Sequence, residues 1–353
     1  MLNHPTGLAA SVWGNNVFDL FITDSSNNVV RKFEVPSGGT GSLSILAGSG
    51  TAGYVDGALG SAQFNDPTDL IGGVTGYMHC IPNCNCQLVY CNQVAYYTLL
   101  YVNDAQNHVV RTICTGLPPG TLGCSAVSTV AGNHTQGYVD GSSLSAEFSV
   151  PLGLFGKAWT PSSTAPLYLG DGANNVIRSW DGANVATFAG SGSRGLVNGY
   201  RTSAQFGTPV KAAWDANGNM YVTDTDNYVI RKIDTAGNVT TFAGTGQPGL
   251  VNGSGSQAQF RFPAGIVFNS ADNYLYVADV HNNVIRRIDL AGNVSTYAGT
   301  GVAGLTNGSR SQAQFSGPTN LLIYSGIMFV SDTLNNVIRR IDMSTGIVST
   351  YIS

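Results

Sequence analysis

The sequence contains few charged residues. Asp, Glu, Lys and Arg together make up 10% of it, whereas a typical globular protein has about 25%. Lys occurs at only four positions, and no cluster of basic residues is available to contact nucleic acid phosphates. No apolar run approaches the roughly 20 residues that cross a bilayer. We therefore expect neither a nucleic-acid partner nor direct insertion into a membrane.

Glycine, in contrast, is abundant. The 353 residues include 45 Gly, and 43% of all residues are hydrophobic, which is ample for a packed core. Many Gly with few Lys or Glu favour short strands joined by tight turns over helices. The composition therefore predicts an all-β protein.

An eight-residue pattern, Asp-x-x-Asn-x-Val-(Ile/Val)-Arg, occurs six times along the chain. Its first and last residues are Asp24 and Arg31, Asp104 and Arg111, Asp171 and Arg178, Asp224 and Arg231, Asp279 and Arg286, and Asp332 and Arg339. A second pattern, A-G-x-G-x-x-G-x-x-(Asp/Asn)-G followed by Ala-x-Phe and Pro, connects successive copies. Such repetition is typical of solenoids, propellers or arrays.

Each repeat predicts four short strands. In the fifth repeat they cover residues 264–268, 274–278, 284–289 and 294–298, which are rich in β-branched and aromatic residues and bounded by turn residues. We expect Asp279 to accept hydrogen bonds from the backbone of its own turn. Six four-stranded antiparallel units around one axis form a six-bladed β-propeller, whose sheet edges are short and protected.

The repeats resemble NHL repeats. The resemblance is carried by segments such as V-A-D-V-H-N-N-V-I-R-R-I-D and G-T-G-V-A-G-L-T-N-G, the latter followed by A-Q-F and P, and it covers nearly the whole chain. It implies a propeller fold, but NHL propellers include RNA-binding domains, extracellular domains and relatives of propeller enzymes. Fold analogy alone therefore does not select a function.

A single propeller domain accounts for residues 1–353. Its blades are expected at residues 5–50, 67–132, 151–190, 209–244, 263–299 and 318–353. In this register the chain starts at the innermost strand of blade 1 and ends at the outermost strand of blade 6. We therefore expect no exchanged strand and packing of blade 1 on blade 6 through side chains alone, and we interpret the sequence as a piece of a longer protein.

The repeated Asp and Arg residues are interpreted as structural. A ring of Asp side chains would offer metal ligands or acids, but an active site breaks symmetry whereas a structural motif repeats it. We expect each Arg to pair with the Asp of its own motif or with backbone carbonyls. We also expect the Phe residues of the connecting pattern to fill the gaps between blades, namely Phe64, Phe148, Phe206, Phe260 and Phe315.

Residues suited to catalysis are scarce. A propeller similar to the amidating lyases would need a His cluster around a metal, and the five His residues do not recur at equivalent blade positions. A lactonase-like propeller would need an axial calcium held by Glu, Asn and Asp, and both Glu34 and Glu147 fall outside the innermost strands. We expect no catalytic residues, no metal and no cofactor, with a metal site of Asp and Asn as the alternative.

All six cysteines lie close together in the sequence. They are Cys80, Cys84, Cys86, Cys91, Cys114 and Cys124. The first four fall in an expected Cys-rich insertion, residues 72–95, between the first two strands of blade 2, and the last two flank the turn between its third and fourth strands. These connections emerge at the same end of a blade, so we expect a disulfide-stapled knob with pairing left open. Zinc binding is the alternative.

Five N-x-S/T sequons provide candidate N-glycosylation sites. They are at Asn133, Asn238, Asn252, Asn293 and Asn307. Together with an even number of clustered cysteines they favour a secretory route, although N-G and G-N dipeptides are also good turns. The segment Met1–Pro5 is not a signal peptide, so any such signal lies outside this sequence.

These observations favour a non-enzymatic extracellular or cell-surface module. We expect it to be part of a larger or polymeric, fibril-like glycoprotein and to bind protein partners, copies of itself or glycans. One alternative is an intracellular NHL scaffold or RNA-binding propeller. Another is a metal-dependent propeller hydrolase or lyase.

Overall fold

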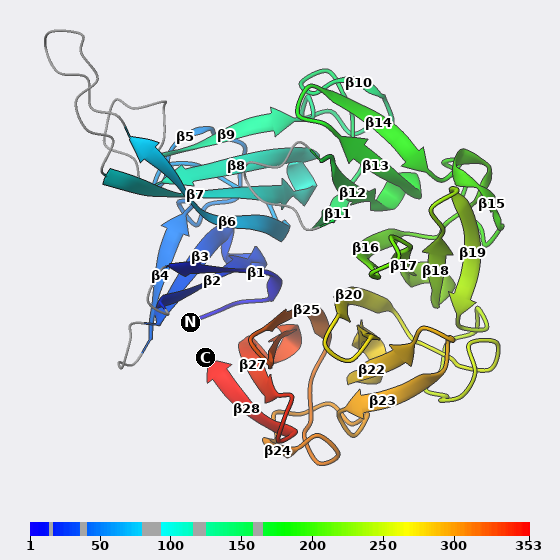
Figure 1. The fold of residues 1–353 in the computed structure, drawn as a ribbon. Coiled ribbons are helices and arrows are strands. Elements are labelled where there is room, and N and C mark those ends of the chain that lie inside the picture. Colours follow the sequence, from blue (N-terminus) through cyan, green and yellow to red (C-terminus); the bar gives the residue numbers. More distant parts are fainter. Residues whose placement is uncertain (14–16, 36–40, 80–92, 116–124, 158–164) are drawn as a thin grey trace, which may run out of the picture.

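The computed structural model is a ring of six antiparallel sheets, or blades, around a central axis (Figure 1). It describes residues 1–13, 17–35, 41–79, 93–115, 125–157 and 165–353. Within these residues no helix has the length and apolar character needed to span a bilayer. The predicted all-β, six-bladed propeller is confirmed.

In every blade four strands follow one another from the axis to the rim. Blade 1 contains β1 (Pro5–Trp13), β2 (Val17–Asp24), β3 (Val29–Val35) and β4 (Ser42–Ala47). Blade 2 contains β6 (Pro67–His79), β7 (Gln93–Asp104), β8 (Val109–Thr115) and β9 (Ala126–Ala131). Blade 3 contains β11 (Pro151–Phe155), β12 (Leu167–Asp171), β13 (Val176–Trp180) and β14 (Asn184–Ala189). Blade 4 contains β16 (Pro209–Trp214), β17 (Met220–Asp224), β18 (Val229–Ile233) and β19 (Asn238–Ala243). Blade 5 contains β20 (Pro263–Asn269), β21 (Tyr274–Asp279), β22 (Val284–Asp289) and β23 (Val294–Ala298), and blade 6 contains β25 (Pro318–Tyr324), β26 (Ile327–Asp332), β27 (Val337–Asp342) and β28 (Ile347–Ile352).

Four blades carry a fifth strand that the sequence analysis did not predict. These short strands are β5 (Gly57–Ala58), β10 (Gly141–Ser142), β15 (Gly199–Tyr200) and β24 (Gly308–Ser309). Each belongs to the linker that precedes a blade and pairs with the outer strand of that blade, as β5 does with β9. Blade 5 has a single bridge at the same place, between Gly253 and Val294. The linkers therefore cover part of the outer sheet edges, which would otherwise be open to pairing with other chains.

A 3₁₀ turn joins the second and third strands of each blade. These turns are η1 (Ser25–Asn27), η2 (Ala105–Asn107), η3 (Gly172–Asn174), η5 (Thr225–Asn227), η6 (Val280–Asn282) and η7 (Thr333–Asn335), and η4 (Arg201–Ser203) lies in a linker. The residue after each of the six turns is left-handed, a conformation that Asn adopts more readily than most residues. Its side chain also contacts the next blade in most cases, as when Asn283 Oδ1 accepts a hydrogen bond from Gly317 N at 3.0 Å.

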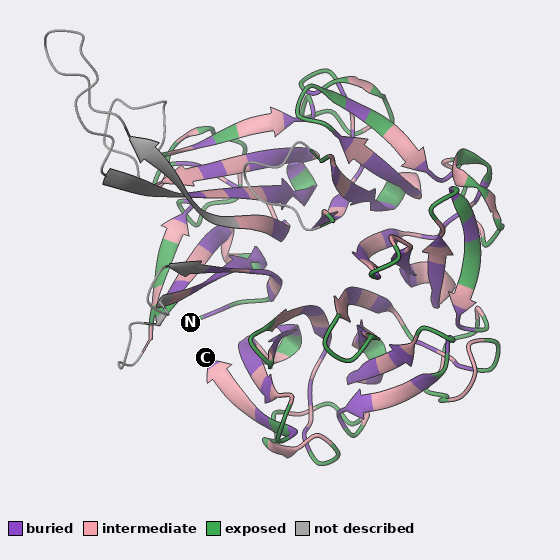
Figure 2. Cartoon of the chain, in the orientation of Figure 1, coloured by how far each residue is buried: buried purple, intermediate pink, exposed green. Residues whose placement is uncertain are grey.

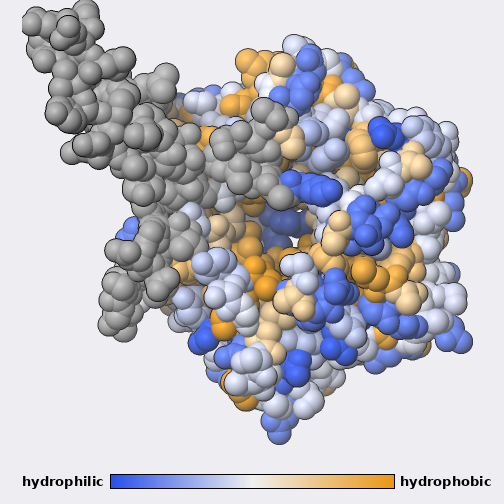
Figure 3. Space-filling view, viewed as in Figure 1, coloured by the Kyte–Doolittle hydropathy of each residue, from blue (hydrophilic) through white to orange (hydrophobic). Residues whose placement is uncertain are grey.

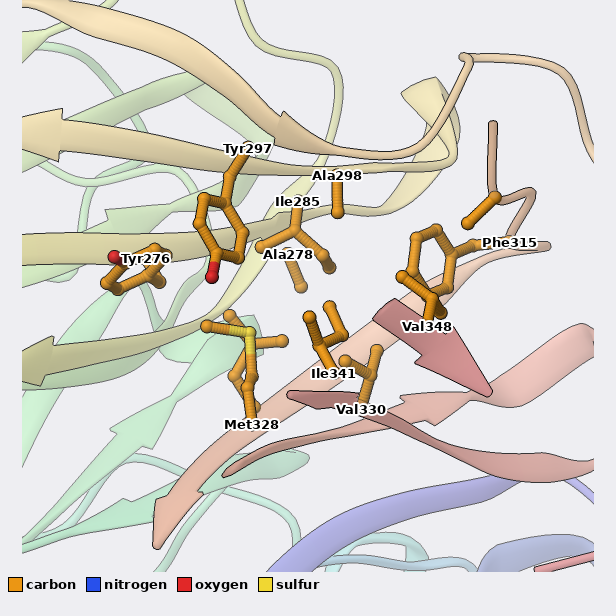
Figure 4. Packing of buried hydrophobic residues seen from close by; sticks show 12 residues of the cluster. Tyr276, Ala278, Ile285, Tyr297, Ala298, Phe315, Met328, Val330, Ile341 and Val348 are labelled. Carbon is orange, nitrogen blue, oxygen red and sulfur yellow. The ribbon is translucent and has the colours of Figure 1, made fainter. Parts of the chain in front are cut away.

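The hydrophobic core lies between neighbouring blades (Figure 2). Between blades 5 and 6, Ile285 and Tyr297 lie opposite Met328 and Ile341, with Phe315 of the linker beside them (Figure 4). The other Phe residues of the connecting pattern are fully buried in the same way: Phe64, Phe148, Phe206 and Phe260. The prediction that these rings fill the gaps between blades is confirmed.

The ring closes where blade 6 meets blade 1, and the two ends of the chain lie side by side there (Figure 1). Thr333 Oγ1 donates a hydrogen bond to Pro5 O at 2.7 Å, and His4 N donates one to Asn336 Oδ1 at 2.8 Å. Similar contacts join other pairs of blades. Our expectation of closure through side chains alone was therefore incomplete, since the backbone at the start of β1 takes part.

The repeated Asp and Arg side chains bind each linker to its blade. In blade 5, Arg286 Nη1 donates to Asp279 Oδ2 at 2.9 Å and to Gln259 O at 2.8 Å. Its Nη2 donates to Val251 O at 2.8 Å, and its guanidinium carbon lies 4.9 Å from the centre of the Phe260 ring. Blades 2, 3, 4 and 6 repeat the ion pair with fully buried side chains. These contacts support the structural interpretation of the repeated Asp and Arg residues.

Two details of this motif differ from expectation. Asp279 Oδ1 accepts a hydrogen bond from Arg261 N of the linker at 2.7 Å and makes no capping bond to its own turn. In blade 1, Arg31 contacts Asp24 and Met1 O and stays 14% exposed. The motif thus anchors linkers in blades 2 to 6, and its arginine is less buried in blade 1.

The first two strands of blade 2 are much longer than those of the other blades. Strands β6 and β7 remain paired from Asp69 and Asn103 as far as His79 and Gln93. Residues 72–79 and 93–95 of the expected insertion therefore extend these strands as a β-ribbon. Residues 80–92 lie outside the described part of the chain.

Asn103 provides a test of packing between blades 2 and 3. Its side chain is fully buried, and neither Oδ1 nor Nδ2 has a hydrogen-bond partner. At the equivalent position of blade 4, Thr223 Oγ1 donates to Ala264 O of the next blade at 2.7 Å. An unsatisfied buried polar group costs about 1–3 kcal/mol, so we expect Asn103→Thr to raise the free energy of unfolding in urea. Thr223→Asn is the reverse control and should lower it; the opposite pattern would refute this account.

Candidate functional site in the central channel

The six innermost strands line the central channel, and the residue at their third position alternates between glycine and a polar residue. The third residue of each strand is, from blade 1 to blade 6, Gly7, Asp69, Gly153, Lys211, Gly265 and Asn320. At this position blades 2, 4 and 6 therefore present polar side chains, and the blades between them have glycine. This alternation breaks the sixfold symmetry of the ring.

The glycines of this set are required because a Cβ atom at these positions would clash with the neighbouring inner strand. A Cβ on Gly153 would lie 2.0 Å from Val210 O, and one on Gly265 would lie 2.6 Å from Thr319 O. Real side chains do not approach backbone atoms so closely, so only glycine lets the neighbouring inner strands come together here. Space close to the axis is thereby left to the three polar side chains.

Asp69, Lys211 and Asn320 meet across the channel, and we call them the axial cluster. Lys211 Nζ donates to Asp69 Oδ1 at 2.8 Å and to Oδ2 at 2.7 Å. Asn320 Nδ2 donates to Oδ1 at 3.0 Å, and Leu154 N donates to Oδ2 at 2.8 Å. The Asp69 side chain is 3% exposed and that of Lys211 14%. A carboxylate has about four acceptor positions, and here four hydrogen bonds occupy them.

The channel beside the axial cluster contains a cavity of about 170 Å³. Its walls come from the inner strands of all six blades and include Thr6, Leu152, Val210, Ala264 and Thr319. The molecule is hollowed at the axis on the face seen in Figure 3. In the described part of the chain, no group of three or more His, Cys, Asp or Glu side chains is arranged to bind a metal ion. The cavity can hold a small molecule or a few waters next to an ion pair that is already formed.

The predicted glycosylation sites all lie at the surface. The exposed residues are Asn133, Asn238, Asn252, Asn293 and Asn307. Asn252 Oδ1 accepts a hydrogen bond from Arg286 Nη2 at 3.0 Å, and Asn293 Nδ2 donates one to Asp289 at 2.8 Å. These Asn side chains therefore have roles in the turns, and their modification by glycans stays a prediction.

Only one of the predicted disulfide cysteines lies in the described part of the chain. This is Cys114, near the end of β8. Cys80, Cys84, Cys86, Cys91 and Cys124 lie outside the described residues. The predicted knob and its pairing are therefore not tested.

The sequence analysis missed the axial cluster. Asp69 and Lys211 are 142 residues apart, and Asp69 and Asn320 are 251 apart, so no local motif joins them. A signal does exist in the sequence: each inner strand begins with Pro, and the residue two positions later alternates between Gly and a polar residue. Comparison of this one position across the six repeats would have found the cluster.

The sheet topology defines the class as a six-bladed β-propeller. No family model matches the sequence. Among curated proteins, the chain is 26% identical over 98% of its length to Protein SUPPRESSOR OF QUENCHING 1, chloroplastic, of Arabidopsis thaliana, and covers 31% of that protein. It is 27% identical over 71% of its length to NHL repeat-containing protein 2 of Homo sapiens, and covers 38% of it. The chain thus spans less than half the length of these relatives.

Among solved structures, virginiamycin B lyase from Staphylococcus aureus shares the fold. The TM-score is 0.50 at 12% identity, and the match covers 99% of this chain and 85% of the lyase. At this level of identity the likeness concerns the fold alone. The six repeats and the relatives named NHL repeat-containing protein 2 support an NHL-type propeller.

Proposed function

We propose that this chain is a non-enzymatic binding and assembly module of a larger extracellular or cell-surface protein. The observation that supports a non-enzymatic role is the state of Asp69, whose two oxygens already accept four hydrogen bonds. A general base must be able to reach a substrate proton, and a metal ligand must have a free lone pair. Neither condition is met by the one carboxylate of the axial cluster.

Exposed apolar side chains on the linkers support a binding role. Each linker exposes a large apolar side chain, and these are Tyr54, Tyr138, Leu196, Leu250 and Leu305. Their exposed fractions lie between 37% and 47%. Repeated exposed apolar residues favour contact with other proteins. The greater length of the curated relatives is consistent with a module that works beside other domains.

The extracellular part of the proposal predicts a change in mass. We expect the native protein to weigh more than the 36.8 kDa of the bare chain, to lose mass on deglycosylation, and to gain six hydrogens on reduction, one for each Cys. Intact-mass spectrometry before and after each treatment measures this, with protein from a host that lacks N-glycosylation as the baseline. A native mass equal to the reduced, unmodified chain would overturn secretion and favour the intracellular scaffold.

A further inference from the structure

A cleft of about 580 Å³ opens between blade 5 and blade 6 away from the channel and contains two arginines. Arg287 projects from β22, and Arg310 follows β24 in the linker of blade 6. Both side chains are half-buried. Ser311 and Thr345 also line the cleft. It is separate from the axial cluster and from the ion pairs of the repeat motif.

Aromatic rings and one glycine hold the two guanidinium groups in place. The guanidinium carbon of Arg287 lies 4.4 Å from the centre of the Tyr274 ring, and that of Arg310 lies 4.6 Å from that of Tyr297. The Tyr297 ring lies between the two blades (Figure 4). A Cβ on Gly346 would lie 2.7 Å from Arg310 Nε, so glycine here lets the side chain lie against the backbone. Such support lowers the entropy that ligand binding must remove from long side chains.

Neither arginine is neutralised by the protein. Within the described residues, no carboxylate lies within 4.0 Å of Arg287 or Arg310. Arg287 Nε is buried and has no acceptor. Blade 5 also carries Asp272 and Asp289, whose carboxylates accept hydrogen bonds from the Tyr276 hydroxyl at 2.6 Å and from Asn293 Nδ2 at 2.8 Å. Within the described residues, no ion pair therefore cancels the charge of the two arginines in the cleft.

The equivalent cleft between blades 3 and 4 contains one arginine, so the pair of arginines is not part of the repeat. There Arg201 occupies the position of Arg310 and lies 5.0 Å from the centre of the Phe188 ring. The position of Arg287 is taken by Ser179. One guanidinium thus belongs to the repeated architecture of these two clefts, and the pair is specific to the cleft between blades 5 and 6.

We propose that the cleft between blades 5 and 6 binds a tetrahedral oxyanion, that is, a sulfate or phosphate group, free or as an ester on a small molecule. Two planar guanidinium groups supply paired donors that match such oxygens, and partial burial strengthens these charged hydrogen bonds. This inference rests on the proposed binding role and names a ligand class for it.

Isothermal titration calorimetry on the full chain tests the proposal, with inorganic sulfate and inorganic phosphate as probes and acetate as the control at constant ionic strength. We expect saturable one-to-one binding of sulfate or phosphate and none of acetate. Arg287→Ala and Arg310→Ala should each weaken binding at least about tenfold, because each removes charge-assisted hydrogen bonds. Arg201→Ala, in the cleft with one arginine, should leave binding unchanged. Arg287→Gln and Arg310→Gln replace the alanine variants if these do not fold.

The two probes also separate the possible sources of the ligand. Stronger binding of inorganic sulfate indicates that the site prefers a sulfate group, and stronger binding of inorganic phosphate indicates a phosphate group. Absence of saturable binding of either anion to the wild-type chain, or an equal loss in Arg201→Ala, would overturn the proposal. Secretion is judged separately by the native mass, so either conclusion can fail while the other stands.

Discussion

Replacing Arg286 with alanine is expected to lower the free energy of unfolding by about 3–5 kcal/mol. The Arg286 side chain is fully buried, and its donors hold the linker carbonyls of Gln259 and Val251 as well as Asp279. The substitution leaves these acceptors unsatisfied and Asp279 without its counter-ion. The hydrophobic core between blades 4 and 5, which includes the Phe260 ring, also loses the stacked guanidinium. Urea denaturation followed by intrinsic fluorescence measures the change.

Arg31→Ala is the matched control, because Arg31 has the same place in blade 1 but is 14% exposed and reaches only Asp24 and Met1. Arg31→Ala should lower the free energy of unfolding clearly less than Arg286→Ala does. Equal decreases would show that linker anchoring is not the source of the stability.

Measuring the stability of Arg286→Ala at several pH values adds a second readout. Burial raises the pKa of Asp279 to about 6, and Arg286 is among the groups that oppose this rise.

Without Arg286 the pKa of Asp279 should rise further. A folded-state pKa above the unfolded value favours the folded protein at low pH, and this contribution is lost as the pH rises through the folded pKa. The stability lost in Arg286→Ala should therefore be smaller at pH 5 than at pH 8. A loss that does not change with pH would mean that Asp279 finds another partner.

Replacing Asp69 with alanine is expected to cost a similar amount, about 3–5 kcal/mol, since it leaves Lys211 charged in the channel without its partner. Lys211 Nζ donates to both Asp69 oxygens, and its side chain is only 14% exposed. The double variant Asp69→Ala/Lys211→Met carries no uncompensated charge. It should be more stable than Asp69→Ala alone, as measured by the same urea titration.

The surface pair of Arg194 and Asp226 supplies the control for this experiment. Its atoms are 3.3 Å apart, and the Arg194 side chain is 64% exposed. Exposed ion pairs contribute about 0–1 kcal/mol, so Arg194→Ala should change stability little. If the double variant were no more stable than Asp69→Ala, the cost would come from lost packing in the channel and not from the charge of Lys211.

Much of the fold was predictable because the repeat is local. The strands expected in blade 5 agree with the observed ones within one residue, since the motif from Asp279 to Arg286 defines a turn and both of its neighbouring strands. The short edge strands such as β5 were not predicted, because a two-residue segment that begins with glycine carries no strand signal by itself. Their pairing depends on where the linker crosses the outer strand of the next blade.

The axial cluster and the cleft with two arginines were missed for a different reason. Both arise where repeats differ from one another, whereas the sequence analysis used what the repeats share. Asp69 pairs with Lys211 only because the ring brings blades 2 and 4 to the same axis. Arg287 and Arg310 come from adjacent blades, and only the packing of those blades places them in one cleft.

The position of the two chain ends has a mechanical consequence. The two chain ends lie side by side at the seam between blades 1 and 6, so tension applied through both ends would pull on that seam first. The hydrogen bonds that Pro5 and His4 form with blade 6 lie there. Under load we expect blade 1 to separate from blade 6 before the other five interfaces between blades break. A covalent crosslink between blades 1 and 6 should therefore raise the force needed to unfold the ring.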